Sequence, residues 1–436
     1  MFKTLAEAFK IKEVRNKIIL TLVLLFVYRL GCWLPIPGID TGVLSAGVEG
    51  NTFLSLLSSV SGGALSQGSF LALGVSPYIT SSIIIQLLSA VIPSWQRLAK
   101  DGGADGRKRL ALYTKIAALL IAIAQAIGIA VGFGAAGSTH LSLFGGNEFL
   151  CYAFIVLVLV AGAMFTVWLG EKITEIGIGN GMSLLIFVGI LSSAGTAILT
   201  NFQDIGAGGK ATQTAIWQLI LFLVVLVAIF ALVVFVDGGE RKVGVQYAKQ
   251  MKGRKMYGGQ STYIPIRVNA NGVMPIIFAS AILTFPQMLF SIFWPDVTTG
   301  FIGWWNSWIG AGSWVYALLL ALLILAFAYF WTMLQFDTEE ISRQIQSNGG
   351  FIPGFRPGKP TAQYLSSINK KITLFGAIFL AFMALIPTLL FTGIGTSGLN
   401  SAFSATGMLI VVSVALEFDK QLEAQLMMRN YRGFLK

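Results

Sequence analysis

The sequence predicts an all-α, polytopic membrane protein whose ten transmembrane helices form two inverted five-helix halves. Hydrophobic residues make up 55% of the 436-residue chain and charged residues only 11%, whereas soluble domains carry about 25% charged residues. The mean hydropathy is +0.77. This composition excludes an ordinary water-soluble enzyme, because too little polar surface remains to coat a folded chain of this length.

Ten apolar windows are each long enough to cross a bilayer, which takes roughly 20 residues per helix. They cover residues 18–36, 70–93, 110–133, 149–169, 177–199, 216–236, 273–294, 312–334, 372–392 and 399–416. A further apolar stretch, residues 53–65, is too short to cross and ends in a glycine pair. It predicts a short re-entrant segment on the outer side that could act as a stopper, with a packed surface half-helix as the alternative.

The basic residues indicate the orientation of the spans. Of the 30 Lys and Arg residues, all but Arg29 and Lys210 fall in tails and loops on one side. By the positive-inside rule that side is cytoplasmic, so both termini are expected in the cytoplasm. The expected parts are an amphipathic N-terminal segment (1–17), a first half (18–199, with the stopper within 53–67), an outer loop (200–215), a second half (216–416, with cytoplasmic loops 238–272 and 335–371) and a cytoplasmic tail (417–436).

A weak internal repeat relates the two halves. Residues 74–83 and 272–282 share the pattern Gly-Val-x-Pro-x-Ile and lie five spans apart, so the two copies run in opposite directions. We expect them to face each other where substrates pass. Pro77 and Pro275 bend their helices and leave carbonyl groups unpaired, which could make a seam able to part. An aliphatic pore of this kind would gate by dewetting and by a stopper rather than select an ion.

Little in the sequence suggests catalysis or ion coupling. No Asp or Glu lies in the middle of a span, the single histidine is His140, and no nucleotide-binding motif is complete. We therefore predict no catalytic residues, no cofactor and no metal. Cys32 and Cys151 are expected to be isolated buried thiols. Arg29, the sole charge in the interior of a span, is expected to have a structural role, by snorkelling or by pairing with backbone carbonyls. A secondary transporter for a small solute is the main alternative, and a membrane enzyme is the third.

The two long cytoplasmic loops are both basic and rich in turn residues. One runs over residues 240–266 and the other carries Pro-Gly turns at 353–358. Such loops could dock on an acidic partner, either RNA phosphate or an acidic protein face. The alternative is that their charge only enforces topology.

Several motifs resemble those of the SecY family of protein translocation channels, over nearly the whole chain. They are LPIPGID at 34–40, SGGAL at 61–65, PYI at 77–79, IIIQLL at 83–88, GIGNG at 177–181, QST at 260–262 and PGFRPG at 353–358. The resemblance implies an hourglass pore that conducts unfolded secretory polypeptides and releases transmembrane segments laterally into lipid.

The resemblance also implies roles for particular positions. An aliphatic ring would seal the pore, and its positions are Val75, Ile79, Met182, Ile186, Ile277 and Ile410, of which Val75 and Met182 depart from the usual isoleucine. The stopper corresponds to the family's plug helix, with Phe53, Leu57, Val60, Gly62, Gly63 and Leu65. A lateral gate for signal sequences would include Pro77, Thr80, Gln125, Asn271 and Pro275.

The basic loops correspond to the docking site for the SecA motor ATPase or a translating ribosome. The docking residues are Arg241, Lys249, Arg254, Lys255, Arg356 and Lys359, with Arg356 at the position that the family needs for coupling to SecA. Implied partners are SecE and SecG homologues, signal sequences, nascent polypeptides and membrane lipids, with SecDF and YidC as further ones. The implied location is the bacterial plasma membrane.

Overall fold

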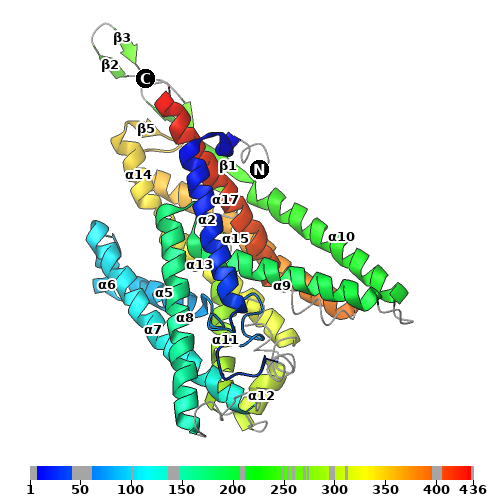
Figure 1. Cartoon of the computed structure of the whole chain (residues 1–436). Helices are drawn as coiled ribbons and strands as arrows, with labels where there is room; N and C mark the ends of the chain where they lie inside the picture. Colours follow the sequence, from blue (N-terminus) through cyan, green and yellow to red (C-terminus); the bar gives the residue numbers. More distant parts are fainter. Residues whose placement is uncertain are drawn as a thin grey trace. The chain divides into compact units, whose positions relative to one another are not determined.

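The computed structural model describes most of the chain (Figure 1). The described residues are 7–41, 61–100, 102–135, 147–206, 212–247, 250–252, 255–257, 261–268, 272, 274–293, 300–309, 313–394 and 405–433. Within them, five helices are long and apolar enough to cross a membrane, at Lys12–Trp33, Asp105–Val131, Glu148–Ile176, Trp314–Ser347 and Lys359–Leu385. Shorter apolar helices cover Ser76–Val91, Gly181–Thr196, Val227–Asp237 and Met274–Leu283. The chain is therefore a multi-pass membrane protein, as predicted.

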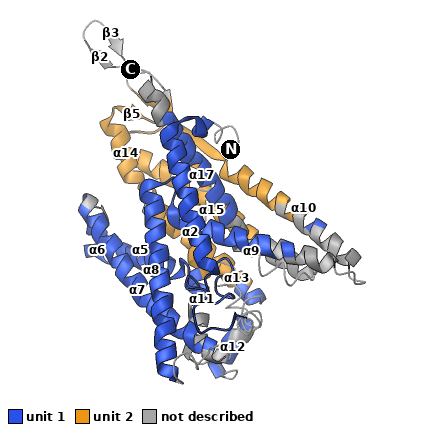
Figure 2. Ribbon diagram, viewed as in Figure 1, with its two compact units in different colours: residues 1–223, 281–316, 387–436 blue, residues 224–280, 317–386 orange. Residues whose placement is uncertain are grey.

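The chain forms two compact units, which Figure 2 shows in different colours. One unit contains Met1–Leu223, Ala281–Tyr316 and Pro387–Lys436, and the other contains Val224–Ser280 and Ala317–Ile386. We call them unit 1 and unit 2. The division into two inverted five-helix halves at residue 200 stays a prediction.

The described part of unit 1 is mainly helical. They are α2 (Lys12–Trp33), α5 (Ser76–Val91), α6 (Pro93–Lys100), α7 (Gly103–Ala135), α8 (Glu148–Ile176), α9 (Gly181–Gly206), α12 (Gly300–Trp308) and α17 (Ala405–Gly433), with the first residues of α10 and the later residues of α11. A buried cluster joins α7 and α8, with Ala122, Ala126, Ile155 and Leu159 among its members. Cys151 belongs to this cluster, and both Cys32 and Cys151 are buried free thiols, as predicted.

The second predicted span begins later than its apolar window. Residues 61–75 form consecutive turns, and α5 starts only at Ser76, with Pro77 in its first turn. Proline is favoured there because its ring presets φ and its missing N–H has no helical partner to lose. The apolar residues from Phe70 to Val75 therefore belong to a packed turn segment rather than to the span.

Unit 2 combines helices with a small sheet that the sequence reasoning missed. Its elements are α10 (Thr212–Asp237, from Val224), β1 (Glu240–Tyr247), β2 (Gln250–Lys252), β3 (Lys255–Tyr257), β4 (Ser261–Arg267), the start of α11 (Met274–Phe293), α13 (Trp314–Gln335, from Ala317), α14 (Thr338–Ser347), β5 (Gly350–Phe351) and α15 (Lys359–Ile394, to Ile386). β1 pairs with β4 and β5 on its two sides, both antiparallel, and β2 pairs with β3.

The sheet is amphipathic. Along β1, Val243 and Val245 are buried while the residues beside them are exposed, which is the alternation that a strand with one solvated face requires. The buried valines pack with Ile266 of β4 and with Leu365 and Ile368 of α15. The basic loops are thus held on a hydrophobic core.

Candidate functional site

Two segments of unit 1 carry predicted pore-ring residues. Val75 and Ile79 lie at the start of α5, and the amide of Ile79 donates to the carbonyl of Val75 at 3.1 Å. Met182 and Ile186 lie at the start of α9. Both pairs have the i, i+4 spacing that places side chains on one face of a helix. Val75 and Ile186 are buried, whereas Ile79 and Met182 are half-buried.

The other two ring positions lie on α17 and α11. Ile410 of α17 is buried, and Ile277 of α11 is half-buried and belongs to unit 2. Met182, one of the predicted ring residues, packs on α8. A Cβ added at Gly170 of α8 would lie 2.5 Å from the Met182 sulfur. The ring as a whole stays a prediction.

The turn at 177–181 fixes the start of α9 and hence the position of Met182 and Ile186, the predicted ring pair on this helix. The Asn180 side chain accepts from the amides of Met182 at 3.1 Å and Ser183 at 3.5 Å, which caps the helix. The amide of Gly181 donates to Thr174 Oγ1 at 2.9 Å. A side chain at Gly181 would clash with the carbonyl of Gly170, so glycine is required for this close approach.

The described end of the predicted plug is held against α2. The carbonyl of Gly62 accepts from Arg29 Nη1 at 2.7 Å, and the carbonyl of Ser61 accepts from the Cys32 thiol at 4.0 Å. Gly63 is half-buried and Leu65 is fully buried. Phe53, Leu57 and Val60 lie outside the described residues.

The predicted lateral-gate residues fall on three helices. Pro77 and Thr80 are in α5, whose neighbour α7 carries Gln125, and Pro275 is in α11. Thr80 donates to the carbonyl of Ser76 at 3.1 Å. Gln125 is 4% exposed, and its Oε1 has no hydrogen-bond partner among the described residues. The remaining gate residue, Asn271, is not among the described residues.

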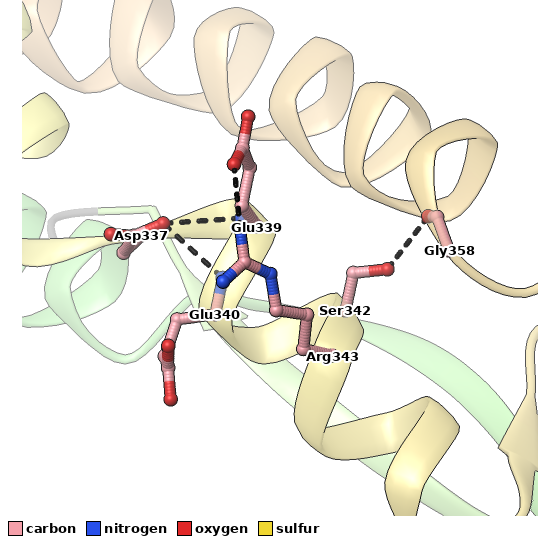
Figure 3. A network of polar contacts seen from close by, with 6 residues as sticks. All are labelled: Asp337, Glu339, Glu340, Ser342, Arg343 and Gly358. Atoms are coloured by element: carbon pink, nitrogen blue, oxygen red, sulfur yellow. Dashed lines mark hydrogen bonds and ion pairs between the residues drawn. The ribbon is translucent and has the colours of Figure 1, made fainter.

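The Arg356 loop of unit 2, residues 352–358, is anchored at several points. Ser342 of α14 donates to the carbonyl of Gly358 at 2.7 Å, as Figure 3 shows. Thr361 Oγ1 donates to the carbonyl of Arg356 at 2.8 Å, and the Phe355 ring stacks on Tyr364 with centroids 3.9 Å apart. The Arg356 side chain is exposed. An exposed arginine on such an anchored loop loses little conformational freedom of its backbone in any contact that it makes.

The helix beneath this loop is itself capped. Asp337 accepts from the amides of Glu339 and Glu340, both at 3.2 Å, and Arg343 Nη2 lies 3.4 Å from Glu339 Oε2 (Figure 3). The cap satisfies amides that a helix start otherwise leaves free. These contacts fix α14, and through Ser342 they fix the loop.

The other predicted docking residues are partly described. Arg241 at the start of β1 and Lys359 at the start of α15 are exposed. Lys255 lies in β3, and Lys249 and Arg254 fall outside the described residues. Sequence reasoning missed Lys242, which lies over the Tyr263 ring at 4.8 Å. The alternation of Val243 and Val245 with Gly244 and Gln246 is the signal that could have revealed this strand.

Comparison with known proteins gives consistent matches. A family described as SecY matches residues 69–418. The chain is 40% identical over 445 residues to the protein translocase subunit SecY of Halalkalibacterium halodurans, covering 100% of both chains. It is 40% identical over 446 residues to that of Thermotoga maritima, covering 100% of this chain and 98% of the relative.

Solved structures share the fold. A protein-conducting channel superposes with a TM-score of 0.65 at 20% identity, covering 94% of this chain and 91% of that one. Sec61 in the canine ribosome-channel complex superposes with a TM-score of 0.60 at 19% identity, again covering 94% and 91%. These matches confirm the predicted fold class. Because full-length relatives are 40% identical and the family match spans most of the sequence, the chain belongs to the SecY family.

Proposed function

We propose that this chain is the channel-forming subunit of a bacterial protein translocase, which moves unfolded secretory polypeptides across the plasma membrane and releases transmembrane segments into lipid. The observation that carries the proposal is the 40% identity to protein translocase subunits over the whole length of both chains. The energy would come from a partner, because the sequence carries no nucleotide-binding motif.

The site geometry supports a passive, gated conduit. The residues assigned to the ring on α5, α9 and α17 are aliphatic or methionine, so they would exclude ions by dewetting without binding a passing chain tightly. The end of the predicted plug lies beside α2 and α9. Pro77 and Thr80 on α5, with Gln125 on α7, would belong to a lateral gate that opens toward lipid, together with Asn271 and Pro275.

We infer that the basic face is cytoplasmic and docks a driving partner, either the SecA motor or a ribosome. The exposed Arg356, Arg241 and Lys359 support this, as does the likeness to Sec61 in a ribosome-channel complex. SecE and SecG homologues would complete the channel, and SecDF and YidC would assist it. Both termini would then lie in the cytoplasm.

A stalled secretory chain tests the proposal directly. A photoreactive amino acid at position 79 or 277 of the reconstituted translocase should crosslink to the stalled polypeptide. The same probe at Leu157, which is 67% exposed on α8, serves as the control and should crosslink mainly to lipid. Equal crosslinking of the polypeptide at all three positions would contradict the assignment of the ring.

A further inference from the structure

Arg29 is the only charged residue in the interior of the ten predicted spans, since Lys115 lies near the edge of the third, and the partner of Arg29 is a backbone carbonyl. Its Nη1 donates to the Gly62 oxygen at 2.7 Å, and its guanidinium carbon lies 5.6 Å from the centroid of the Trp33 ring. Among the residues that the structure describes, Arg29 forms no ion pair. The charge is therefore satisfied by the Ser61–Leu65 segment, 33 residues away in the chain.

Gly62 fits tightly between two helices. Its φ is +72°, and an added Cβ would lie 2.9 Å from Arg29 Nη1 and 3.0 Å from the Cα of Gly189 on α9. Both the backbone conformation and the lack of space favour glycine at this position. Arg29 thus holds the segment directly against the backbone of the helix that also carries Met182 and Ile186.

A second contact from α2 reinforces the first. Cys32, one helical turn after Arg29, donates its thiol hydrogen to the carbonyl of Ser61. This contact is long, at 4.0 Å, and a thiol is a weak donor, so Arg29 makes the stronger of the two contacts from this face of α2. Cys32 is only 1% exposed, so its thiol lies beneath this segment.

We propose that Arg29 is a positioning residue that latches the Ser61–Leu65 segment onto α2 and α9 and thereby keeps the resting channel sealed. This inference rests on the proposed function. A charge-assisted hydrogen bond is stronger than a neutral one, especially away from water. A carbonyl partner also makes the latch reversible, because its release leaves no second unpaired charge, as release of a buried ion pair would.

The test compares Arg29→Met with Arg15→Met in reconstituted proteoliposomes. Both substitutions remove one positive charge from α2, but Arg15 is exposed near its start. Loss of a charge-assisted hydrogen bond should raise the population of unlatched channels about 10- to 100-fold, seen as a higher ion leak and as export of substrates with defective signal sequences. Arg15→Met should behave as the wild type. An unchanged leak in Arg29→Met would overturn the proposal.

The native thiols give a second readout that is independent of transport. In Arg29→Met, Cys32 should react with a small membrane-permeant thiol reagent on the order of tenfold faster than in the wild type. Cys151, fully buried between α7 and α8, should stay unreactive and so report that the variant is folded. An unchanged Cys32 rate would overturn the latch.

Two further outcomes are decisive. If Cys151 also reacts, Arg29→Met has unfolded. Gly62→Ala then takes its place as the test variant, because the added Cβ would lie 2.9 Å from Arg29 Nη1 and so disturb the same hydrogen bond. An unchanged leak in a folded Gly62→Ala variant would then refute the latch. Failure of the wild-type channel to export any protein would refute the proposed function instead, so the two failures are distinguishable.

Discussion

Replacing Ser342 by alanine removes one anchor of the Arg356 loop while leaving Arg356 itself in place. Ser342 is 2% exposed, and its hydroxyl donates to the carbonyl of Gly358 at 2.7 Å. If the loop must be held in place to dock its partner, this change should weaken docking without changing the charge of the surface.

The expected cost follows from the contacts of the carbonyl that loses its donor. A typical intramolecular hydrogen bond contributes about 0.5–1.5 kcal/mol, and a buried group left unpaired costs about 1–3 kcal/mol. The Gly358 carbonyl still accepts from the amide of Ala362 at 3.1 Å, so it does not become unpaired. We therefore expect the free energy of local opening of the loop to fall by about 1 kcal/mol, which corresponds to roughly a fivefold rise in the population of the open loop.

Hydrogen exchange of the reconstituted protein measures this opening. Amides in residues 352–358 should exchange roughly fivefold faster in Ser342→Ala, with β1 and β4 unaffected. The matched control is Ser347→Ala on the same helix, whose exposed hydroxyl bonds only to the carbonyl of Gln344. If both variants, or neither, accelerate exchange in the loop, the anchoring argument fails.

The other predictions concern charge, seal and helix start. Arg356→Glu should reduce motor-driven export at least tenfold in a folded protein, because it reverses the exposed charge on the Arg356 loop. Normal export by this variant would contradict the assignment of Arg356 to the docking site. Ile79→Gly combined with Ile277→Gly should raise ion conductance through reconstituted channels severalfold, because an aliphatic constriction is widened, whereas unchanged conductance would count against the ring. Asn180→Ala should lower the free energy of unfolding by about 1 kcal/mol, because α9 loses its cap, and this is measured as a lower thermal midpoint. Asn180→Asp can still accept from both amides, so it should keep most of that stability.

The membrane helices were predictable because their length and apolarity are local properties of the sequence. The ends of these helices were less predictable, because polar residues can continue a helix beyond the bilayer. The apolar window at 372–392, for example, is part of α15, which begins at Lys359. The opposite happened at 70–75, where apolar residues fold into turns. The amide of Phe70 donates to the carbonyl of Leu34 at 3.3 Å, and a second long-range bond lies just before this stretch. Ile36 donates to the carbonyl of Gly68 at 2.8 Å, a pairing that no local pattern reveals.

In the candidate site too, some features could be predicted from the sequence and others could not. The residue types at positions 79, 186 and 356 were evident from motifs, but their anchors were not. Arg29 was expected either to snorkel or to pair with backbone carbonyls, and Gly62 could not be identified as its partner across 33 residues. The sheet around β1 was missed because three consecutive charged residues, 240–242, precede its two buried valines, and the charge was interpreted as a basic loop.

The Arg356 loop also has a mechanical consequence. It runs directly into α15, whose segment Lys359–Leu385 is continuous and apolar enough to cross a membrane. At 1.5 Å per residue, its 27 residues span about 40 Å. With no break in this segment to absorb movement, a push or twist that a docked partner applied to the loop, as proposed, would be transmitted along the helix as by a stiff rod toward the interior of the bilayer.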